Sequence, residues 1–370
     1  LAAEVPVKAL FSHAETGNLI TYRRDVRVAA WAAQRGIRWQ QFRQDGVIRS
    51  LRSRDGWSAR WAQRMNRPSL LQPERMAAPR GIPGVGLLAP EDLGLPSSAK
   101  PEAQRGGMNQ GEEALRSFLQ ERGVNYRADM SSPVEGWEGC SRLSPYLAFG
   151  CLSIRTIHQA AGSRVAELRA LVRSGGPVDR RWLGSLSSFG ARLRWHCHFM
   201  QKLEDEPRIE FENFSRAFDG MREGFSATPE AEERFRRWQE GTTGYPMVDA
   251  CMRAVRATGW LNFRMRAMVA SFAAYHLWLH WREPAVYLGR HFLDFEPGIH
   301  FSQFQMQSGT TGINTLRIYS PAKQALDQDP KGVFIRRWIP ELARVPESWL
   351  SQPHLMPLEM QARCGCFIGK

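Results

Sequence analysis

Short apolar runs around one helical pattern predict a small α/β unit at the start of the chain. Residues 7–13 form an apolar run that ends in a polar loop, as expected for a buried strand. From Val26 to Gln34 the apolar positions recur at helical spacing, and Asp25 is the expected N-cap. Residues 37–42 then alternate like a second strand. Because a parallel sheet needs more strands than these, residues 1–66 are interpreted as the tail of a larger α/β domain.

The remainder of the sequence predicts a linker followed by helices only. Residues 67–107 are rich in proline and glycine and show little periodicity, so we expect an interdomain linker there. Residues 108–370 carry helical patterns and no convincing strand, with segments at 112–121, 154–173, 182–203, 229–240, 246–257 and 260–281. The predicted fold is therefore mostly α, with an all-helical domain preceded by a partial α/β domain.

The composition is that of an ordinary globular protein. The chain has 370 residues, of which 43% are hydrophobic and 24% charged, so it is long enough for two well-filled domains and is not disordered throughout. No uninterrupted apolar run reaches the length of a membrane span. The six cysteines are scattered without paired spacing, which is typical of reduced thiols. We expect a cytoplasmic protein that does not enter a membrane.

The charge is strongly basic but does not identify a partner by itself. Lys and Arg number 50 against 37 Asp and Glu, which gives a net charge of +13, and arginine outnumbers lysine 44 to 6. A surface that binds nucleic-acid phosphates explains this excess, because arginine forms forked hydrogen bonds with phosphate. A GC-rich genome with solvated charged faces explains it as well.

Histidines, cysteines and tryptophans are the candidates for metal, cluster or redox sites. His276 and His280 have the i, i+4 spacing of a helical metal pair, but no neighbouring Glu completes the motif of a metalloprotease. Cys364 and Cys366 match no iron–sulfur spacing with the other cysteines. The thirteen tryptophans are expected to lie mostly in the core. We predict no metal site.

Four local segments carry more specific information. They are Cys140–Gly150 (CSRLSPYLAFG), Thr243–Ala250 (TGYPMVDA), Thr258–Arg266 (TGWLNFRMR), and Arg317–Pro321 (RIYSP) followed by Arg336–Leu342 (RRWIPEL). In this order and at these separations they resemble the flavin-binding helical domain of the DNA photolyase and cryptochrome family, over about residues 108–345. Residues 13–17 and 22–25 resemble the end of that family's N-terminal antenna domain, whose first strands are absent from this sequence.

The resemblance implies FAD as the cofactor. Ser141 and Ser144 precede Pro145 and the helix that it would start, where hydroxyls and amides can hold a diphosphate. Arg266 and Asp294 align with the family's ion pair beside the flavin ring, which would orient the ring. The cofactor-binding residues that the resemblance implies are Tyr126, Cys140, Ser141, Arg142, Leu143, Ser144, Arg192, Trp195, Arg266, Asp294, Glu296 and His300.

The resemblance also implies light-driven repair of DNA. A photolyase would use light and reduced FAD to send an electron into a cyclobutane pyrimidine dimer that is flipped out of the duplex. The implied catalytic residues are Trp195, Trp281 and His300, and the implied DNA-binding residues are Trp260, Arg264 and Arg317. We expect a monomer that acts on ultraviolet-damaged DNA. We expect no stably bound antenna chromophore, because a sheet without its first strands would lose much of that pocket.

Several positions depart from the well-known photolyase pattern. Arg192 stands where a Glu binds the dimer, and Phe263 stands where an Asn is expected. His300 stands at the position that faces flavin N5, where an imidazole can form a hydrogen bond and change charge near neutral pH. The substrate therefore need not be the commonest one of the family.

One departure affects electron transfer and keeps other functions open. Phe304 replaces the tryptophan nearest to the flavin in the family's relay, so we expect that relay to be broken and another aromatic, such as Trp278 or Tyr275, to replace it. These changes favour an alternative function, a cryptochrome-type blue-light photoreceptor that binds FAD without repairing DNA. A flavin-free helical DNA-binding or scaffold protein is a third hypothesis.

Overall fold

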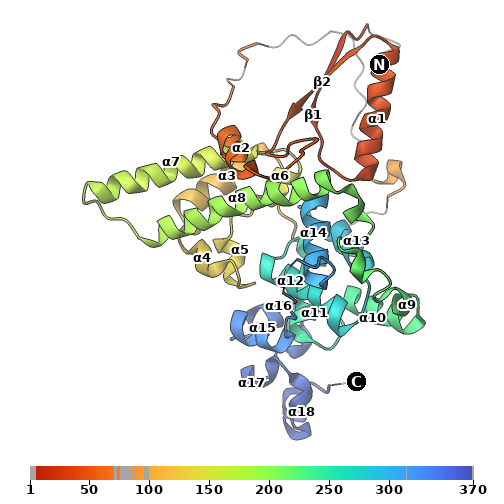
Figure 1. The fold of residues 1–370 in the computed structure, drawn as a ribbon. Helices are drawn as coiled ribbons and strands as arrows, with labels where there is room; N and C mark the ends of the chain where they lie inside the picture. Colours follow the sequence, from red (N-terminus) through yellow and green to blue (C-terminus); the bar gives the residue numbers. More distant parts are fainter. Residues whose placement is uncertain are drawn as a thin grey trace.

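The computed structural model describes residues 6–70, 73–75, 86, 88–95, 100–313 and 315–368 (Figure 1). The first elements are β1 (Ala9–Ala14), α1 (Leu19–Gln34), β2 (Arg38–Arg43), α2 (Trp57–Met65), α3 (Met108–Gln120), α4 (Tyr126–Asp129), α5 (Glu135–Gly139), α6 (Ser144–Ala148), α7 (Ile154–Arg173) and α8 (Arg181–Asp205). They are followed by α9 (Glu223–Ser226), α10 (Pro229–Glu240), α11 (Pro246–Thr258), α12 (Phe263–Ser271), α13 (Arg282–His291), α14 (Pro297–Ser308), α15 (Pro321–Gln328), α16 (Val333–Trp338), α17 (Glu347–Leu350) and α18 (Leu358–Cys364).

The predicted fold class is confirmed. β1 and β2 pair in parallel, with Ala9 opposite Arg38 and Ala14 opposite Arg43, and α1 connects them. In the described residues no strand follows β2, and the rest of the chain is helical or irregular. The molecule is therefore a helical body that carries a two-stranded α/β unit at one end (Figure 1).

The start of α1 differs from the prediction. The helix begins at Leu19, and Asn18 caps it by accepting a hydrogen bond from the Thr21 backbone N–H at 3.3 Å. The predicted cap, Asp25, lies inside the helix, where its carboxylate accepts hydrogen bonds from Gln41 and from a neighbouring arginine. The prediction was wrong because the apolar pattern starts only at Val26, whereas the exposed first turns of α1 have no such pattern.

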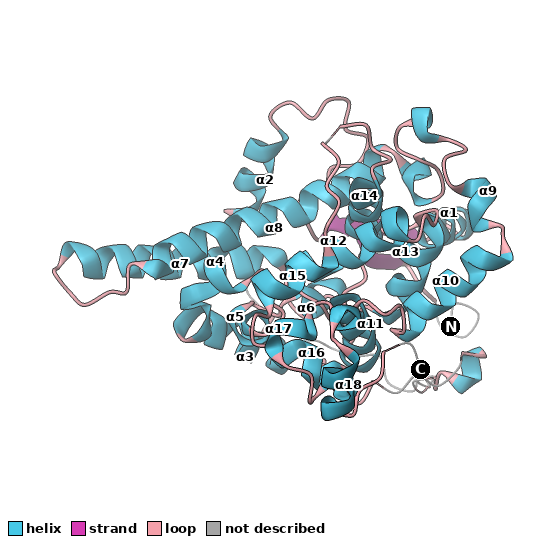
Figure 2. Ribbon diagram, turned by 90° about the horizontal axis from the view of Figure 1, so that it is seen from below, coloured by secondary structure: helices cyan, strands magenta, loops and turns pink. Residues whose placement is uncertain are grey.

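The helices with polar faces follow the prediction closely. α7 and α10 span the predicted 154–173 and 229–240, and α8 and α11 extend the predicted segments by a few residues. α7 and α8 pack against each other and form a long pair that projects from the body (Figures 1 and 2).

The predicted helix 260–281 is wrong in extent. α12 begins only at Phe263 and continues into a π-helical turn, Phe272–His276. Trp278 then adopts a left-handed conformation with φ of 59°, which an L-residue enters only at a cost. Because the segment is buried on nearly every side, its sequence is largely apolar. The pattern therefore does not mark where the π-turn lies or where the helix ends.

Two apolar cores hold the helical body together. One contains side chains of α10 to α14 and of the C-terminal helices, such as Trp238, Phe272 and Trp281. The other joins α2 to α3, α4, α7 and α8, because Trp57 and Trp61 of α2 are buried with Phe118 and its neighbours. Thus α2 packs on the helical body, although it lies within the predicted remnant 1–66.

Part of the predicted linker also contacts the helical body. The Glu102 backbone N–H donates to the Ala257 carbonyl at 3.2 Å, and Lys100 Nζ donates to the Arg256 carbonyl at 3.2 Å. Residues 71–72, 76–85, 87 and 96–99 of this stretch lie outside the described residues. The domain boundaries at 66 and 107 stay a prediction.

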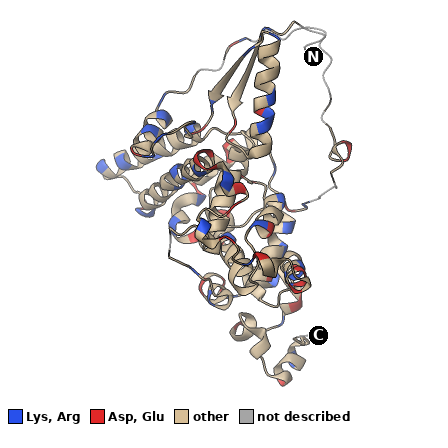
Figure 3. Ribbon diagram, turned by 45° about the vertical axis from the view of Figure 1, so that its right-hand side comes forward, with Lys and Arg blue, Asp and Glu red and all other residues tan. Residues whose placement is uncertain are grey.

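Charged residues are distributed over the whole molecule. Lys and Arg lie along α1 and on the helical body, with Asp and Glu among them (Figure 3). Within the described residues, every helix is too short or too polar to cross a lipid bilayer.

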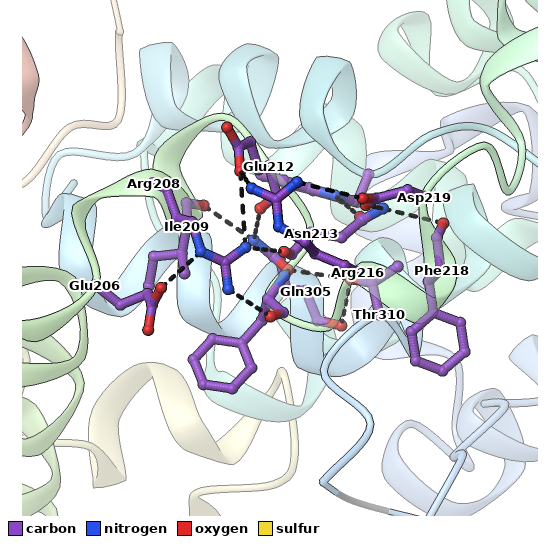
Figure 4. A network of polar contacts seen from close by, with 12 residues as sticks. Glu206, Arg208, Ile209, Glu212, Asn213, Arg216, Phe218, Asp219, Gln305 and Thr310 are labelled. Carbon is purple, nitrogen blue, oxygen red and sulfur yellow. Dashed lines mark hydrogen bonds and ion pairs between the residues drawn. The ribbon is translucent and has the colours of Figure 1, made fainter.

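A buried polar network fixes α14 to the connection that follows α8 (Figure 4). The Gln305 amide donates to the carbonyl oxygens of Ile209 at 2.9 Å and Glu212 at 2.8 Å. Its Oε1 accepts from the Phe214 backbone N–H at 2.6 Å. Gln305 is 1% exposed, so the Gln305 end of each hydrogen bond is shielded from water. The network positions α14, whose other side chains line the cavity described below.

Candidate functional site

A cavity of about 290 Å³ opens between α8, α12 and α14. This volume is close to the lower end of the range for small-molecule sites, roughly 300–1,000 Å³. The predicted site residues that line it are Tyr126, Cys140, Ser141, Arg142, Ser144, Arg192, Trp195, Trp260, Arg266, Asp294, Glu296 and His300. The cavity therefore brings together segments that are far apart in the sequence.

The inner wall of the cavity, defined as Arg266, Phe292, Asp294 and His300, is built around an ion pair. Arg266 Nη1 and Nη2 donate to the two carboxylate oxygens of Asp294 at 3.0 and 2.8 Å, and Nε donates to the Leu261 carbonyl at 2.7 Å. Burial alone would raise the pKa of Asp294, but the charge and hydrogen bonds of Arg266 outweigh it and lower the pKa. Asp294 is therefore ionised, and all three guanidinium nitrogens of Arg266 donate hydrogen bonds that fix its position.

The His300 imidazole completes the inner wall as a neutral group. Its Nε2 lies 2.7 Å from the Ala285 carbonyl oxygen, and since a carbonyl can only accept, Nε2 carries the proton. Burial lowers the pKa of His300 to about 4, so the ring is uncharged at neutral pH. Nδ1 is then the remaining acceptor. The predicted change of charge near neutral pH is not supported by this environment.

The loop before α6 forms a second side of the cavity and is held from behind by Arg122. That guanidinium donates to the carbonyl oxygens of Glu138, Cys140 and Ser141, so these carbonyls point towards it. Burial raises the pKa of the Cys140 thiol to about 12, so it is a neutral group in the wall. Arg122 was not identified from the sequence, since one arginine in a basic chain carries no distinguishing signal.

Arg142 of this loop lies between two indole rings. Its guanidinium carbon is 3.9 Å from the ring centroid of Trp137 and 4.2 Å from that of Trp260. Burial lowers its pKa to about 10, which leaves it cationic at neutral pH. The backbone of Arg142 is left-handed, with φ of 59°, which turns the side chain into this aromatic corner.

Glu296 and His196 are buried titratable groups on the same cavity. Burial raises the pKa of Glu296 to about 8, and the nearby charge of Asp45 adds to the rise, so its carboxyl is mostly protonated at neutral pH. Burial lowers the pKa of His196 to about 4, so its imidazole is neutral. Neither group therefore contributes charge to the cavity.

Several polar atoms around the cavity lack partners within the described chain. The buried atoms Nε of Arg142, Nδ1 of His196, Oδ1 of Asn262, Oε1 of Glu296 and Oε1 of Gln303 make no hydrogen bond. Buried polar groups are nearly always satisfied in native proteins, and leaving one unsatisfied costs about 1–3 kcal/mol. Such a concentration of unsatisfied donors and acceptors indicates a cavity that binds a polar ligand.

The charge of the lining indicates which kind of ligand. At neutral pH the cavity presents the guanidinium groups of Arg142, Arg192 and Arg266 against the single ionised carboxylate of Asp294. The lining is therefore net positive. Forked hydrogen bonds from arginine favour phosphate and carboxylate oxygens, so an anionic ligand such as a dinucleotide diphosphate fits.

The mouth of the cavity, defined as Arg192, Trp195 and Phe263, is open and aromatic. Trp195 is 47% exposed and Phe263 is 41% exposed. The Arg192 guanidinium carbon lies 5.2 Å from the ring centroid of Trp195 and 5.0 Å from that of Phe263. The mouth thus offers flat apolar faces and a cation to a second ligand.

Four predicted site residues do not line the cavity. Leu143 is buried in the core that contains α8, and Trp281 is buried with its indole N–H donating to Asn213 Oδ1 at 2.9 Å. Arg264 is half-buried beside the mouth, and Arg317 is exposed. Their cofactor, catalytic and DNA-binding roles stay predictions. For the first two, any role has to act through side chains that do line the cavity.

Other lining residues were missed by sequence reasoning. They are mostly apolar or amide side chains, namely Met130, Phe199, Leu261, Ala267, Ala270, Phe292, Ile299, Gln303 and Gln307. In sequence they are indistinguishable from ordinary core positions, because the side of a helix that faces a cavity has the same periodicity as the side that faces a neighbour. Among the described residues, no group of three His, Cys, Asp or Glu side chains is placed to hold a metal ion.

Comparison with known proteins gives a consistent picture. Residues 189–370 match the family model for the FAD binding domain of DNA photolyase. Cryptochrome-2 of Arabidopsis thaliana is 32% identical over 288 residues, which are 75% of this chain and 45% of that protein. A deoxyribodipyrimidine photo-lyase of Thermus thermophilus is 34% identical over 280 residues, which are 73% of this chain and 57% of that protein.

Solved structures show the same fold. A bacterial class III photolyase from Agrobacterium tumefaciens superposes with a TM-score of 0.84 at 22% identity, covering all of this chain and 76% of that chain. The cryptochrome of Synechocystis sp. PCC6803 gives a TM-score of 0.82 at 23% identity, again over 100% of this chain and 76% of that chain.

The fold and the matched residues define a helical FAD-binding domain. The chain belongs to the DNA photolyase and cryptochrome family. It spans about half the length of the curated relatives that it matches. Both photolyases and cryptochromes are among these relatives at similar identity, so family membership does not distinguish repair from light sensing.

Proposed function

We propose that the cavity between α8, α12 and α14 binds FAD. The observation that carries this proposal is the lining, which is net positive and contains unsatisfied buried polar atoms of both kinds, donors and acceptors. Ser141, Arg142 and Ser144 would hold the diphosphate, because all three line the cavity and their side chains can donate hydrogen bonds to phosphate oxygens. Arg266, Asp294 and His300 would hold the flavin ring at the inner wall.

Bound FAD supplies the absorption of blue light and a reducing electron, while the protein positions its surroundings. Arg266 and Asp294 are held rigidly by each other, so they need no rearrangement to orient a polar ring. Phe292, over which the Arg266 guanidinium lies at 4.0 Å, excludes water from that side. His300 keeps its proton on Nε2 and presents an acceptor at Nδ1.

We propose further that the protein repairs pyrimidine dimers in DNA. Relatives at 34% identity are named deoxyribodipyrimidine photo-lyases, and the open aromatic mouth suits an unstacked base. Trp195 and Phe263 offer faces for stacking, and the excess of arginine over the chain favours association with phosphates.

The experiment uses the full chain loaded with FAD and chemically reduced. Oligonucleotides that carry cyclobutane dimers are illuminated with blue light, and recovery of the pyrimidine absorbance near 260 nm is followed, with a dark sample as the control. We expect recovery only in the light. A protein that retains FAD but produces no recovery from any dimer contradicts the repair proposal and leaves cofactor binding intact.

A second candidate is a blue-light photoreceptor without repair activity. It is favoured by Arg192, which places a cation at the mouth where a carboxylate binds the dimer in the resembling photolyases, and by the similarity to Arabidopsis cryptochrome-2. Under this alternative, illumination of the FAD-loaded protein changes its proteolytic digestion pattern without repairing DNA.

A further inference from the structure

Within the part of the chain that the structure describes, Arg192 is the arginine of the cavity that has no polar partner. Arg266 is bound bidentately to Asp294, and Arg142 is enclosed by two indole rings with its Nη1 near a backbone carbonyl. Arg192 makes no hydrogen bond and no ion pair with any described residue, and it lines the cavity at the mouth. Its guanidinium is not among the buried unsatisfied groups, so solvent or a ligand can reach it.

The rings beside Arg192 fix its position without using its donors. A guanidinium that lies over aromatic faces keeps its N–H groups available at the edge of its plane. Trp195 and Phe263 are both partly exposed, so a flat guest can lie on them beside that edge. The mouth therefore combines two stacking surfaces with an unused pair of parallel N–H donors.

We propose that Arg192 forms hydrogen bonds with the edge of a base in the bound pyrimidine dimer. The cavity would therefore prefer dimers that contain cytosine over thymine–thymine dimers. Cytosine presents two adjacent acceptors, N3 and O2, which match a pair of parallel N–H donors, as they do with guanine in a base pair. Thymine presents O2, N3–H and O4, so a donor stands between its acceptors. Arginine has no acceptor for that N3–H, whereas a carboxylate has one.

This inference rests on the proposed function, since it concerns which dimer enters the mouth. It differs from the cofactor role that the family resemblance implies for Arg192. That role predicts loss of FAD when Arg192 is replaced, whereas base selection predicts that FAD is retained and only the preference among guests changes.

The test compares two oligonucleotides that differ only in the lesion, a thymine–thymine or a freshly prepared cytosine–cytosine cyclobutane dimer. Dissociation constants are measured in the dark by fluorescence anisotropy with the FAD-loaded full chain. One good bidentate contact to a base corresponds to about tenfold discrimination or more. We expect the cytosine dimer to bind at least about tenfold more tightly, and this advantage to decline as cytosine deaminates to uracil, which carries N3–H.

Three variants of Arg192 test whether its forked donors, and not only its charge, produce the preference for cytosine. Arg192→Gln is expected to retain FAD and lose the preference, and Arg192→Lys to lose it as well, because lysine keeps the charge but lacks the fork. Arg192→Glu is expected to reverse the preference towards thymine. The matched control is Arg194→Gln, an exposed arginine two positions away on α8, which should leave the ratio unchanged.

The outcomes distinguish this inference from the function on which it rests. Equal binding of the two dimers by the wild-type protein overturns the inference while repair stands. A preference that survives in Arg192→Gln also overturns it, and loss of FAD in that variant assigns Arg192 to the cofactor instead. A wild-type protein that binds neither dimer better than undamaged DNA overturns the proposed function and the inference together.

Discussion

The inner wall and the mouth of the same cavity are built in opposite ways. At the inner wall, the charged and polar groups are paired with one another, as Arg266 is with Asp294 and His300 with a carbonyl oxygen. At the mouth, Arg192 has no polar partner among the described residues, and the aromatic rings beside it are partly exposed. Paired groups are preorganised and costly to disturb, whereas unpaired ones are available for a ligand. The comparison assigns stability and cofactor orientation to the wall, and choice of guest to the mouth.

The largest effect is expected from Asp294→Ala at the inner wall. Removal of one partner of a buried ion pair leaves the Arg266 charge uncompensated and costs about 3–5 kcal/mol of unfolding free energy. Denaturant unfolding measures this cost, and the flavin absorbance of the purified protein should fall as well. The control is Glu341→Ala, which breaks the exposed Arg253–Glu341 pair and should cost about 1 kcal/mol or less.

A smaller loss is expected from Gln305→Leu, which breaks the network that supports α14. The substitution removes three hydrogen bonds to the backbone and a fourth, from Thr310 Oγ1 at 3.3 Å, and leaves two carbonyls and one N–H without partners, at a cost of about 2–3 kcal/mol in unfolding free energy. If Gln305 supports the inner wall, cofactor affinity falls together with stability. An unchanged denaturation midpoint contradicts this role of the network shown in Figure 4.

Trp195→Ala at the mouth is expected to weaken DNA binding without changing stability or cofactor binding. The side chain is 47% exposed, so the unfolding free energy should change by about 0.5 kcal/mol or less. Loss of a stacking face should weaken binding of dimer-containing DNA by about 1–3 kcal/mol. The FAD content should be unchanged, in contrast to the cofactor role that the resemblance implies for Trp195. A variant that loses FAD but binds DNA normally would reverse the assignment of wall and mouth.

The smallest effect is a pH dependence through Glu296. Its pKa is about 8 in the folded protein, above its ordinary value, so the folded state retains a proton that the unfolded state releases. Stability contributed by this group therefore decreases as pH rises from the unfolded pKa to about 8, and is constant above that. Ionisation above this pKa also adds a negative charge near the cavity, so FAD affinity should fall by less than about tenfold between about pH 7 and pH 9.

The matched variant for this pH effect is Glu296→Gln, which cannot ionise. Its FAD affinity should be nearly constant over the same range. A wild-type affinity that is equally constant would show that Glu296 does not titrate there.

Helices with one buried face and one exposed face could be predicted from the sequence. Segments that are buried or exposed on all sides could not. α7 and α10 each have a polar face, so their apolar spacing gives their bounds. The segment 260–281 is apolar and buried on nearly all sides, so nothing in its pattern marks the π-turn at Phe272–His276. The cap of α1 was missed for a related reason, because the turn after Asn18 is exposed and lacks an apolar pattern.

The sequence predicted most of the charged and polar residues of the site but few of the apolar residues that line it. Arg266 and Asp294 were named from the family resemblance and do form the ion pair of the inner wall. Phe292 and Ile299 were not named, since an apolar side chain that faces a cavity looks like one in the core. The lack of a partner for Arg192 within the described chain is a three-dimensional property, because it depends on what other segments bring close to it.

The most direct test of the cofactor site is an absorption spectrum of the full chain after incubation with FAD and removal of the free cofactor. The wild-type protein should retain about one FAD per chain, with the flavin bands near 370 and 450 nm. Trp195→Ala should retain the same amount, and Asp294→Ala should retain much less. A colourless wild-type protein, or equal retention by wild type and Asp294→Ala, would contradict the assignment of this cavity to FAD.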